Sequence, residues 1–273
     1  MNKHYLGLHV SKQTLLYMLN KYDTNVYQIM VSSPTSYSNG SQFDPKTLSE
    51  IKSLIEKKNV KLFIHGKYLY NFCRPDDRGI KVLINEISLA NELSAPIVIH
   101  QGKNVNKLSI SEAIALYVSQ LEKVVPYVAE GNYLVLENSA HQGTEIGYDL
   151  ETLEAIYKSF SDESRKKIKF CIDTCHIFVS GVLSFVDEDE IDTFFEEFEE
   201  RIGLSNLIAV HLNDSNKPCN SCNDNHEAIG VGHIPYVGLL HFAKMCKFYN
   251  IPMILETPNT IPYDEQLAKI DSI

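Results

Sequence analysis

The chain has 273 residues, 44% of them hydrophobic, which is enough for one large domain with a substantial core. No apolar run approaches the roughly 18–20 residues of a membrane span, and six cysteines in a chain this long do not make a disulfide scaffold, so we expect a reducing, intracellular setting and no secretion. The formal net charge of −10 argues at first sight against a nucleic-acid partner.

Strands and helices are predicted to alternate along the chain. Short apolar runs predict eight strands, at about 4–10, 26–32, 60–65, 96–100, 132–137, 168–173, 206–211 and 251–256. Helical spacing of apolar residues predicts helices at 44–58, 79–93, 111–125, 187–201 and 238–249. The first of these opens on Asp44 and Pro45, a pair typical of a helix N-terminus. Repeated strand–helix units predict an α/β fold, a (β/α)8 TIM barrel formed by one domain over residues 1–273.

Six of the predicted strands end on a His, Asp or Glu. These residues are His65, His100, Glu137, Asp173, His211 and Glu256. Parallel strands of one barrel end on the same face, so the six side chains should converge there. A single His at a strand end is more often hydrogen-bonded than metal-bound, but an unpaired carboxylate on a buried strand costs several kcal/mol. Imidazole and carboxylate groups are donors that divalent metal ions accept, so the pattern indicates a metal site.

Three further donors lie just beyond strand ends. His176 follows Asp173 closely, and Asp224 and His226 stand in a long polar loop at about 212–235. The last two, taken alone, could be ordinary loop polarity. Nine donors exceed what one ion can use and suit two or three ions. Three divalent ions would change the formal charge from −10 to −4, so an acidic protein could still present a cationic face to nucleic acid.

Most of these donors stand in short motifs. The most specific are Cys171-Ile-Asp-Thr-Cys-His176, His211-Leu-Asn-Asp214 and Leu255-Glu-Thr-Pro258; the others are Gly7-Leu-His-Val-Ser11, His65-Gly-Lys-Tyr68, His100-Gln-Gly102, Leu136-Glu-Asn-Ser-Ala-His-Gln-Gly143 and Asp224-Asn-His226. With them the chain resembles, over nearly its whole length, the endonuclease IV family of apurinic/apyrimidinic (AP) endonucleases. The resemblance implies a barrel of the xylose isomerase-like superfamily and a base excision repair enzyme. Such an enzyme cleaves duplex DNA 5′ to an abasic site and leaves 3′-hydroxyl and 5′-deoxyribose phosphate ends.

The resemblance also implies three Zn²⁺ ions per chain, with Mn²⁺ as an alternative occupant of one site. His65, His100 and Glu137 would hold the first ion, and Glu137 would bridge to a second ion. Asp173, His211 and Glu256 would complete that second site, while His176, Asp224 and His226 would hold the third. Glu137 is the expected catalytic residue, because the attacking hydroxide would lie beside it.

For DNA contacts the resemblance singles out Tyr68, whose ring would enter the minor groove; packing on the barrel rim is the simpler alternative. Phosphate contacts could come from loop cations, which could equally be solvated charges: Lys67, Lys103, Arg74, Lys107 and Lys217. Thr35 stands roughly where bacterial members insert an Arg, and Gln101 replaces the Pro of the usual His-Pro-Gly. His9 and Asn213 are candidates to orient the metal ligands, and Cys219 and Cys222 are interpreted as an ordinary loop pair.

Two other functions are compatible with parts of this pattern. A sugar isomerase or epimerase of the same barrel superfamily also gathers Glu, Asp and His at strand ends, but with one or two ions it would leave His176, Asp224 and His226 without a role. A non-catalytic DNA-binding barrel would not need the complete donor set. We therefore expect a monomer that acts on abasic duplex DNA in a bacterial cytoplasm or a viral factory.

Overall fold

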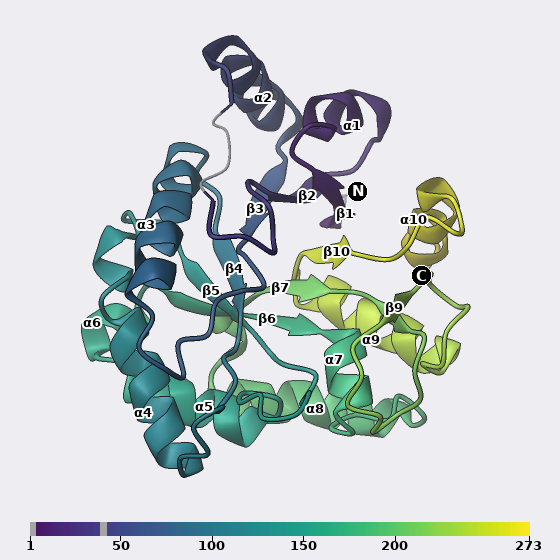
Figure 1. Ribbon diagram of the computed structural model, residues 1–273. Helices are drawn as coiled ribbons and strands as arrows, with labels where there is room; N and C mark the ends of the chain where they lie inside the picture. The colour runs from purple at the N-terminus through teal and green to yellow at the C-terminus, as the bar shows by residue number, and fades with distance from the viewer. Residues whose placement is uncertain (1–3, 39–42) are drawn as a thin grey trace.

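The computed structural model describes residues 4–38 and 43–273. Eight parallel strands close into a barrel (Figure 1). They are β1 (Leu6–Ser11), β2 (Val26–Met30), β3 (Lys61–His65), β4 (Ile97–His100), β5 (Leu134–Glu137), β6 (Ile168–Asp173), β7 (Leu207–His211) and β10 (Met253–Leu255). Each strand pairs with its neighbours in chain order, and β1 pairs with both β2 and β10, which closes the ring. All eight predicted strands, and with them the TIM-barrel fold, are confirmed.

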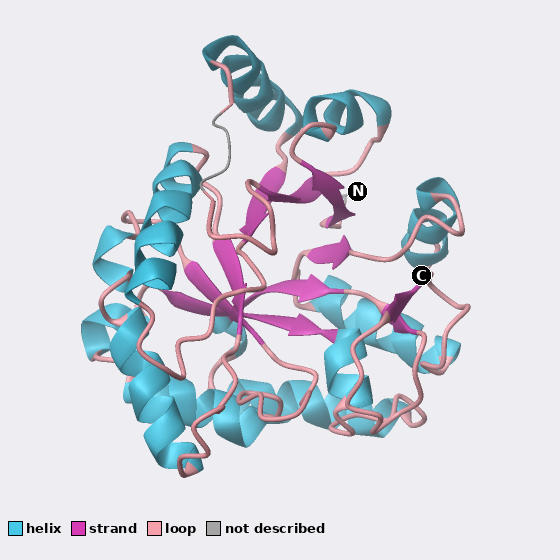
Figure 2. Ribbon diagram, in the orientation of Figure 1, coloured by secondary structure: helices cyan, strands magenta, loops and turns pink. Residues whose placement is uncertain are grey.

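The helices surround the strands on the outside (Figure 2). They are α1 (Leu15–Lys21), α2 (Pro45–Lys58), α3 (Asp77–Glu92), α4 (Ile110–Leu121), α5 (Leu150–Ser159), α6 (Asp162–Arg165), α7 (Thr174–Val179), α8 (Glu188–Arg201), α9 (Tyr236–Phe248) and α10 (Tyr263–Asp271), with short 3-10 turns η1 (Val125–Tyr127) and η2 (Leu204–Asn206). Asp44 caps α2 as expected, since its carboxylate accepts from the Thr47 N–H at 3.0 Å. None of the helices that the structure describes combines the length and the hydropathy of a membrane span.

The five predicted helices are present as α2, α3, α4, α8 and α9, with one boundary to correct. The helix expected at 111–125 ends at Leu121, and η1 is a separate turn that contains Pro126. Five other helices were not predicted: α1, α5, α6, α7 and α10. They have ten residues or fewer. Helices this short complete too few turns for their apolar spacing to be recognised.

The interior of the barrel has an apolar layer with a polar layer above it. The apolar layer consists of Val26, Phe63, Val98, Val135, Cys171, Ala209 and Ile254. Gly7 takes the equivalent place in β1, where an added Cβ would come within 1.7 Å of the Val26 carbonyl oxygen. Side chains two positions apart on a strand point to the same face. The residue two positions further along each strand therefore also points inward, at the mouth of the barrel. All eight of these residues are polar: His9, Gln28, His65, His100, Glu137, Asp173, His211 and Glu256.

The long loop after β7 is more ordered than its polar sequence suggested. It contains an antiparallel pair, β8 (Asp214–Ser215) and β9 (His226–Glu227). The buried carboxylate of Asp214 accepts hydrogen bonds from the backbone N–H groups of Ser215, Gly230, Gly232 and Ile234, at 2.7–3.1 Å. Gly232 approaches so closely that a Cβ there would lie 2.3 Å from the Ser215 carbonyl oxygen. These contacts, together with the hydrogen bond from the Cys222 N–H to the Val179 carbonyl, hold the loop that brings Asp224 and His226 to the barrel mouth.

Candidate metal centre

The nine predicted donors lie together at the mouth of the barrel. The ligand atoms of eight of them form three groups, each with all atoms within 4.8 Å of one another: His65, His100 and Glu137; Glu137, Asp173, His211 and Glu256; and Asp173, His176 and His226. The ninth, Asp224, belongs to a fourth such group with Cys175 and His226. Glu137 and Asp173 each belong to two groups, so the three groups are contiguous. Together with Asp224, which contacts the third group, the structure thus brings together every side chain that the sequence selected as a ligand.

The third group differs in detail from the expected set. Asp224 contacts both histidines, with Oδ2 3.2 Å from His176 Nε2 and Oδ1 3.1 Å from His226 Nε2. Asp173 also reaches this group, because its Oδ2 lies 3.4 Å from His226 Nε2. The buried thiol of Cys175 lies 3.9 Å from Asp224 Oδ1. Burial raises the pKa of this thiol to about 12, so it is a hydrogen-bond donor to the group at neutral pH.

Glu137 lies at the centre of the donor set and is fully buried. One carboxylate oxygen is 3.3 Å from His65 Nε2 and 3.2 Å from His100 Nε2, and the other is 3.0 Å from His211 Nδ1. Burial alone would raise the pKa of Glu137, but His100 and His211 outweigh it and hold the pKa well below its usual range. Glu137 is therefore ionised and shared between two donor groups.

Two buried atoms of the donor set have no hydrogen-bond partner, namely Glu137 Oε2 and His226 Nε2. Buried polar atoms of folded proteins are nearly always satisfied, and an exception calls for an ion, a water or a catalytic role. Both atoms point at other donors across gaps of 3.1–3.4 Å. Divalent metal ions among these nitrogens and oxygens would satisfy both atoms, so the residues present fit a metal centre.

Hydrogen bonds from the outer ring nitrogens orient several of the histidines. His65 Nδ1 donates to the Gly66 carbonyl at 2.7 Å, and His176 Nδ1 to the Asn138 carbonyl at 2.8 Å. A neutral imidazole carries one proton, so a donating outer nitrogen leaves the inner nitrogen with a free lone pair. Metal-binding histidines in proteins are commonly held in this way.

The carboxylates are oriented as well. The Asn213 amide donates to Asp173 Oδ2 at 2.7 Å and accepts from the Glu256 N–H at 2.9 Å, and His9 Nδ1 lies 2.7 Å from Glu256 Oε1. The structure thus places His9 and Asn213 beside the donors, as expected. Gln28, whose amide contacts both Glu256 and His211, was not among the residues predicted from the sequence. Its signal was a polar residue within the apolar strand β2.

Comparisons with known proteins identify the family whose motifs this sequence resembles. Residues 21–272 match the family model described as a xylose isomerase-like TIM barrel. Over 277 residues the chain is 32% identical to a Buchnera aphidicola protein that bears the name probable endonuclease 4, covering 96% of each chain. This chain belongs to the endonuclease IV family. A protein of Acanthamoeba polyphaga mimivirus, named a putative endonuclease 4, is 31% identical over 267 residues, which cover 91% of this chain and 85% of the viral one.

Solved structures at lower sequence identity show only that this endonuclease IV family member shares their fold. Endonuclease IV from the bacterium Thermus thermophilus superposes with a TM-score of 0.81 at 22% identity, over 98% of each chain. A D-tagatose 3-epimerase-like protein superposes with a TM-score of 0.71 at 19% identity, over 98% of each chain. The barrel is therefore shared with proteins of different chemistry, and function has to be argued from the site.

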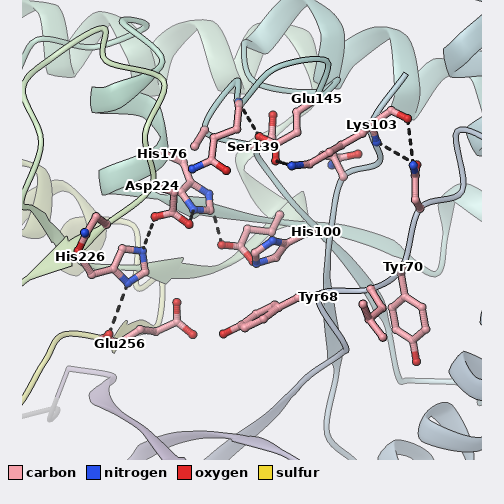
Figure 3. Close-up of a pocket in the computed structure, with 17 residues that line it drawn as sticks. Tyr68, Tyr70, His100, Lys103, Ser139, Glu145, His176, Asp224, His226 and Glu256 are labelled. Carbon is pink, nitrogen blue, oxygen red and sulfur yellow. Dashed lines mark hydrogen bonds and ion pairs between the residues drawn. The ribbon is translucent and has the colours of Figure 1, made fainter. Parts of the chain in front are cut away.

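A cavity of about 580 Å³ opens beside the donors in this family member. Tyr68 forms one wall, with its ring 5.2 Å from that of His100, and Lys103 lies on the far side with Nζ 3.3 Å from Glu145 Oε1 (Figure 3). The Tyr68 side chain is half exposed, and partial burial raises its pKa, so it stays a neutral phenol. Gln101 also lines the cavity, but its amide is buried and neither amide atom has a hydrogen-bond partner.

The phosphate contact predicted for Lys67 disagrees with its surroundings. Its side chain is buried, and its ammonium group contacts Ser32 Oγ, donates to the Ser33 carbonyl at 2.9 Å and lies 3.7 Å from Glu86. The ammonium group of Lys67 is therefore paired within the protein, where it connects the loop after β2 to Glu86 on α3. Arg74, Lys103 and Lys107 are exposed, and Lys217 is partly exposed.

Proposed function

We propose that this protein is a metal-dependent AP endonuclease. It would hydrolyse duplex DNA 5′ to an abasic site, leaving 3′-hydroxyl and 5′-deoxyribose phosphate ends, as a monomer with residues 1–273 acting as one domain. The observation that supports this most is the set of nine donors in three contiguous groups at the mouth of a barrel of the endonuclease IV family.

Three Zn²⁺ ions fit the donors best, because imidazole nitrogen and carboxylate oxygen suit this borderline metal, with Mn²⁺ as an alternative in one site. His65, His100 and Glu137 would hold one ion, and Glu137, Asp173, His211 and Glu256 a second. His176, Asp224 and His226 would hold the third, with Asp173 close by. When bound, such ions supply a hydroxide near neutral pH and offset charge on the phosphate.

The protein's own groups would prepare this chemistry. Glu137 is ionised, and its two oxygens face His65 and His100 on one side and His211 on the other, so it would hold ions of both groups. The outer hydrogen bonds of His65 and His176 orient the two rings so that their inner nitrogens face the other donors. Asn213 and His9 hold the carboxylates of Asp173 and Glu256 in place, so little reorganisation is needed when substrate binds.

The cavity beside the donors is a suitable place for the lesion. An abasic nucleotide has no base to unstack or unpair, so it leaves the duplex at a lower cost than a normal nucleotide. Tyr68 stands half exposed at the cavity wall and would fill the gap left in the duplex. Lys103, whose ammonium is exposed and paired at the cavity edge with Glu145, is a better candidate for a phosphate contact than the buried Lys67.

A sugar isomerase or epimerase remains the second candidate, because the D-tagatose 3-epimerase-like protein shares the fold. The two functions differ in the number of ions they need. About three zinc ions per chain, measured by elemental analysis, would support the nuclease, and one or two the isomerase. Activity on ketose sugars without incision of DNA would establish the alternative.

The deciding assay uses a 5′-labelled duplex with one tetrahydrofuran site, which cannot undergo β-elimination. The expected product is a single cut immediately 5′ to the lesion. Glu137→Gln should lower the rate at least about 100-fold, because loss of a preorganised charged group at a reaction centre costs that much or more. Glu163→Gln, an identical change on an exposed side chain, is the control. Tight binding of the lesion without any cut would refute the proposal and favour the non-catalytic barrel.

A further inference from the structure

Gln28 is a fully buried, uncharged side chain in the polar layer at the barrel mouth. It lies two residues after Val26 on β2, and Val26 belongs to the apolar layer below. Every other strand places a His, Asp or Glu at this level. A buried amide without partners costs a few kcal/mol, so its contacts indicate what it does there.

Both ends of the Gln28 amide contact predicted metal ligands. Its oxygen lies 3.0 Å from His211 Nε2, and its nitrogen lies 2.7 Å from Glu256 Oε1. The orientation of the amide follows from the chemistry of the partners. A carboxylate oxygen only accepts, so the amide NH₂ must face Glu256, and the amide oxygen must then face His211.

This orientation fixes the tautomer of His211. An amide oxygen only accepts, so His211 Nε2 must carry the ring proton. The other nitrogen, Nδ1, faces Glu137 at 3.0 Å and Glu256 at 3.1 Å, so it is the nitrogen that would give up its proton to an ion bound in this group. His211 would therefore bind metal through Nδ1, whereas His65 and His176 present Nε2.

The same amide also fixes the carboxylate of Glu256. Oε1 receives Gln28 Nε2 at 2.7 Å and His9 Nδ1 at 2.7 Å, so its lone pairs are engaged away from the metal groups. Oε2 is left on the side of His211 Nδ1. Gln28 thus determines which atom each of two neighbouring ligands offers to the same ion.

We propose that Gln28 is a positioning residue for the metal group of Glu137, Asp173, His211 and Glu256. It selects the His211 tautomer through its oxygen and the free oxygen of Glu256 through its nitrogen. This inference rests on the proposed metal centre but not on the identity of the substrate. Loss of a partner that orients a metal ligand in this way typically costs 10–100-fold in metal affinity or activity.

The test compares three variants of the full-length protein. Gln28→Met removes both contacts at similar volume. Gln28→Glu keeps an acceptor for His211 but sets a second carboxylate against Glu256 Oε1. Gln120→Met removes a buried amide from α4, outside the nine-donor set, and controls for the loss of buried polarity. Gln28→Glu differs from the native side chain in a single atom, so it remains informative should Gln28→Met fail to fold.

Zinc affinity is measured by chelator competition, and the imidazole tautomers by nitrogen NMR of the zinc-loaded, histidine-labelled protein. We expect Gln28→Met to weaken one zinc site about 10–100-fold and to release the His211 tautomer. Gln28→Glu should keep the tautomer and still weaken that site. The inference is overturned if neither Gln28 variant changes zinc affinity more than Gln120→Met does. Failure of the wild-type protein to cut abasic DNA would instead overturn the proposed function and leave the zinc comparison valid.

Discussion

Asp214→Asn should destabilise the protein strongly, although it changes a single atom. The Asp214 carboxylate is fully buried, and each oxygen accepts two backbone N–H groups: Oδ1 from Ser215 and Ile234, and Oδ2 from Gly230 and Gly232. Asparagine keeps only one of these oxygens, so two N–H donors would face an NH₂ group. Hydrogen bonds to a charged acceptor contribute about 1.5–3 kcal/mol each, so two lost bonds would cost up to about 3–6 kcal/mol. Burial raises the pKa of Asp214 despite these bonds, so the removal of a buried charge offsets part of this loss.

Urea unfolding of the metal-free protein, followed by circular dichroism, measures this loss. Domains are stable by about 5–15 kcal/mol in total, so the expected shift of the midpoint is large. Asp44→Asn is the matched control, because Asp44 is an N-cap and asparagine caps helices about as well as aspartate. The zinc site that contains Asp224 and His226 should weaken in parallel, since Asp214 anchors their loop. An effect of Asp214→Asn no larger than that of Asp44→Asn would refute this reasoning.

Three further predictions concern charge. Lys67→Met should lower the free energy of unfolding by about 3–5 kcal/mol, because it leaves Glu86 buried without its cation. Lys103→Met should leave stability unchanged but weaken binding to abasic DNA in anisotropy titrations. The opposite outcome would contradict the structural role of Lys67 and the phosphate contact of Lys103. Burial lowers the pKa of His226, but Asp173 and the other carboxylates around it outweigh burial and raise the pKa to about 9 in the metal-free protein. Below that pH a metal ion must displace the proton, so zinc affinity at this group should fall by up to about tenfold per pH unit as the pH decreases from 9. Calorimetry in buffers of different ionisation enthalpy detects the released proton, and identical apparent enthalpies would contradict it.

The barrel and the convergence of the nine donors could be predicted from the sequence, because both follow from short-range patterns of apolar and polar residues. Buried parallel strands are continuous apolar runs, and the polar residue that ends each run marks the carboxyl edge of the barrel. The loop donors were harder to place, since Asp224 reaches the site through long-range contacts of its loop, such as those of Asp214 with Gly230 and Gly232 and that of the Cys222 N–H with the Val179 carbonyl. Lys67 was misjudged for a related reason: a lysine that directly follows a strand end looks exposed in sequence, and only the packed structure brings Glu86 and the Ser33 carbonyl to it.

Gln28 shows what a stricter use of strand periodicity would have found. The last residue of an apolar run is a mouth residue only when the run stops at the mouth of the barrel. β2 continues past its mouth residue to Met30, so Gln28 lies inside the run. Counting two positions from the residue in the apolar layer selects the mouth residue on all eight strands, including His9 on β1 and Gln28 on β2. A buried amide in this ring must be paired with its neighbours, which is why an uncharged residue can control the geometry of the charged ones.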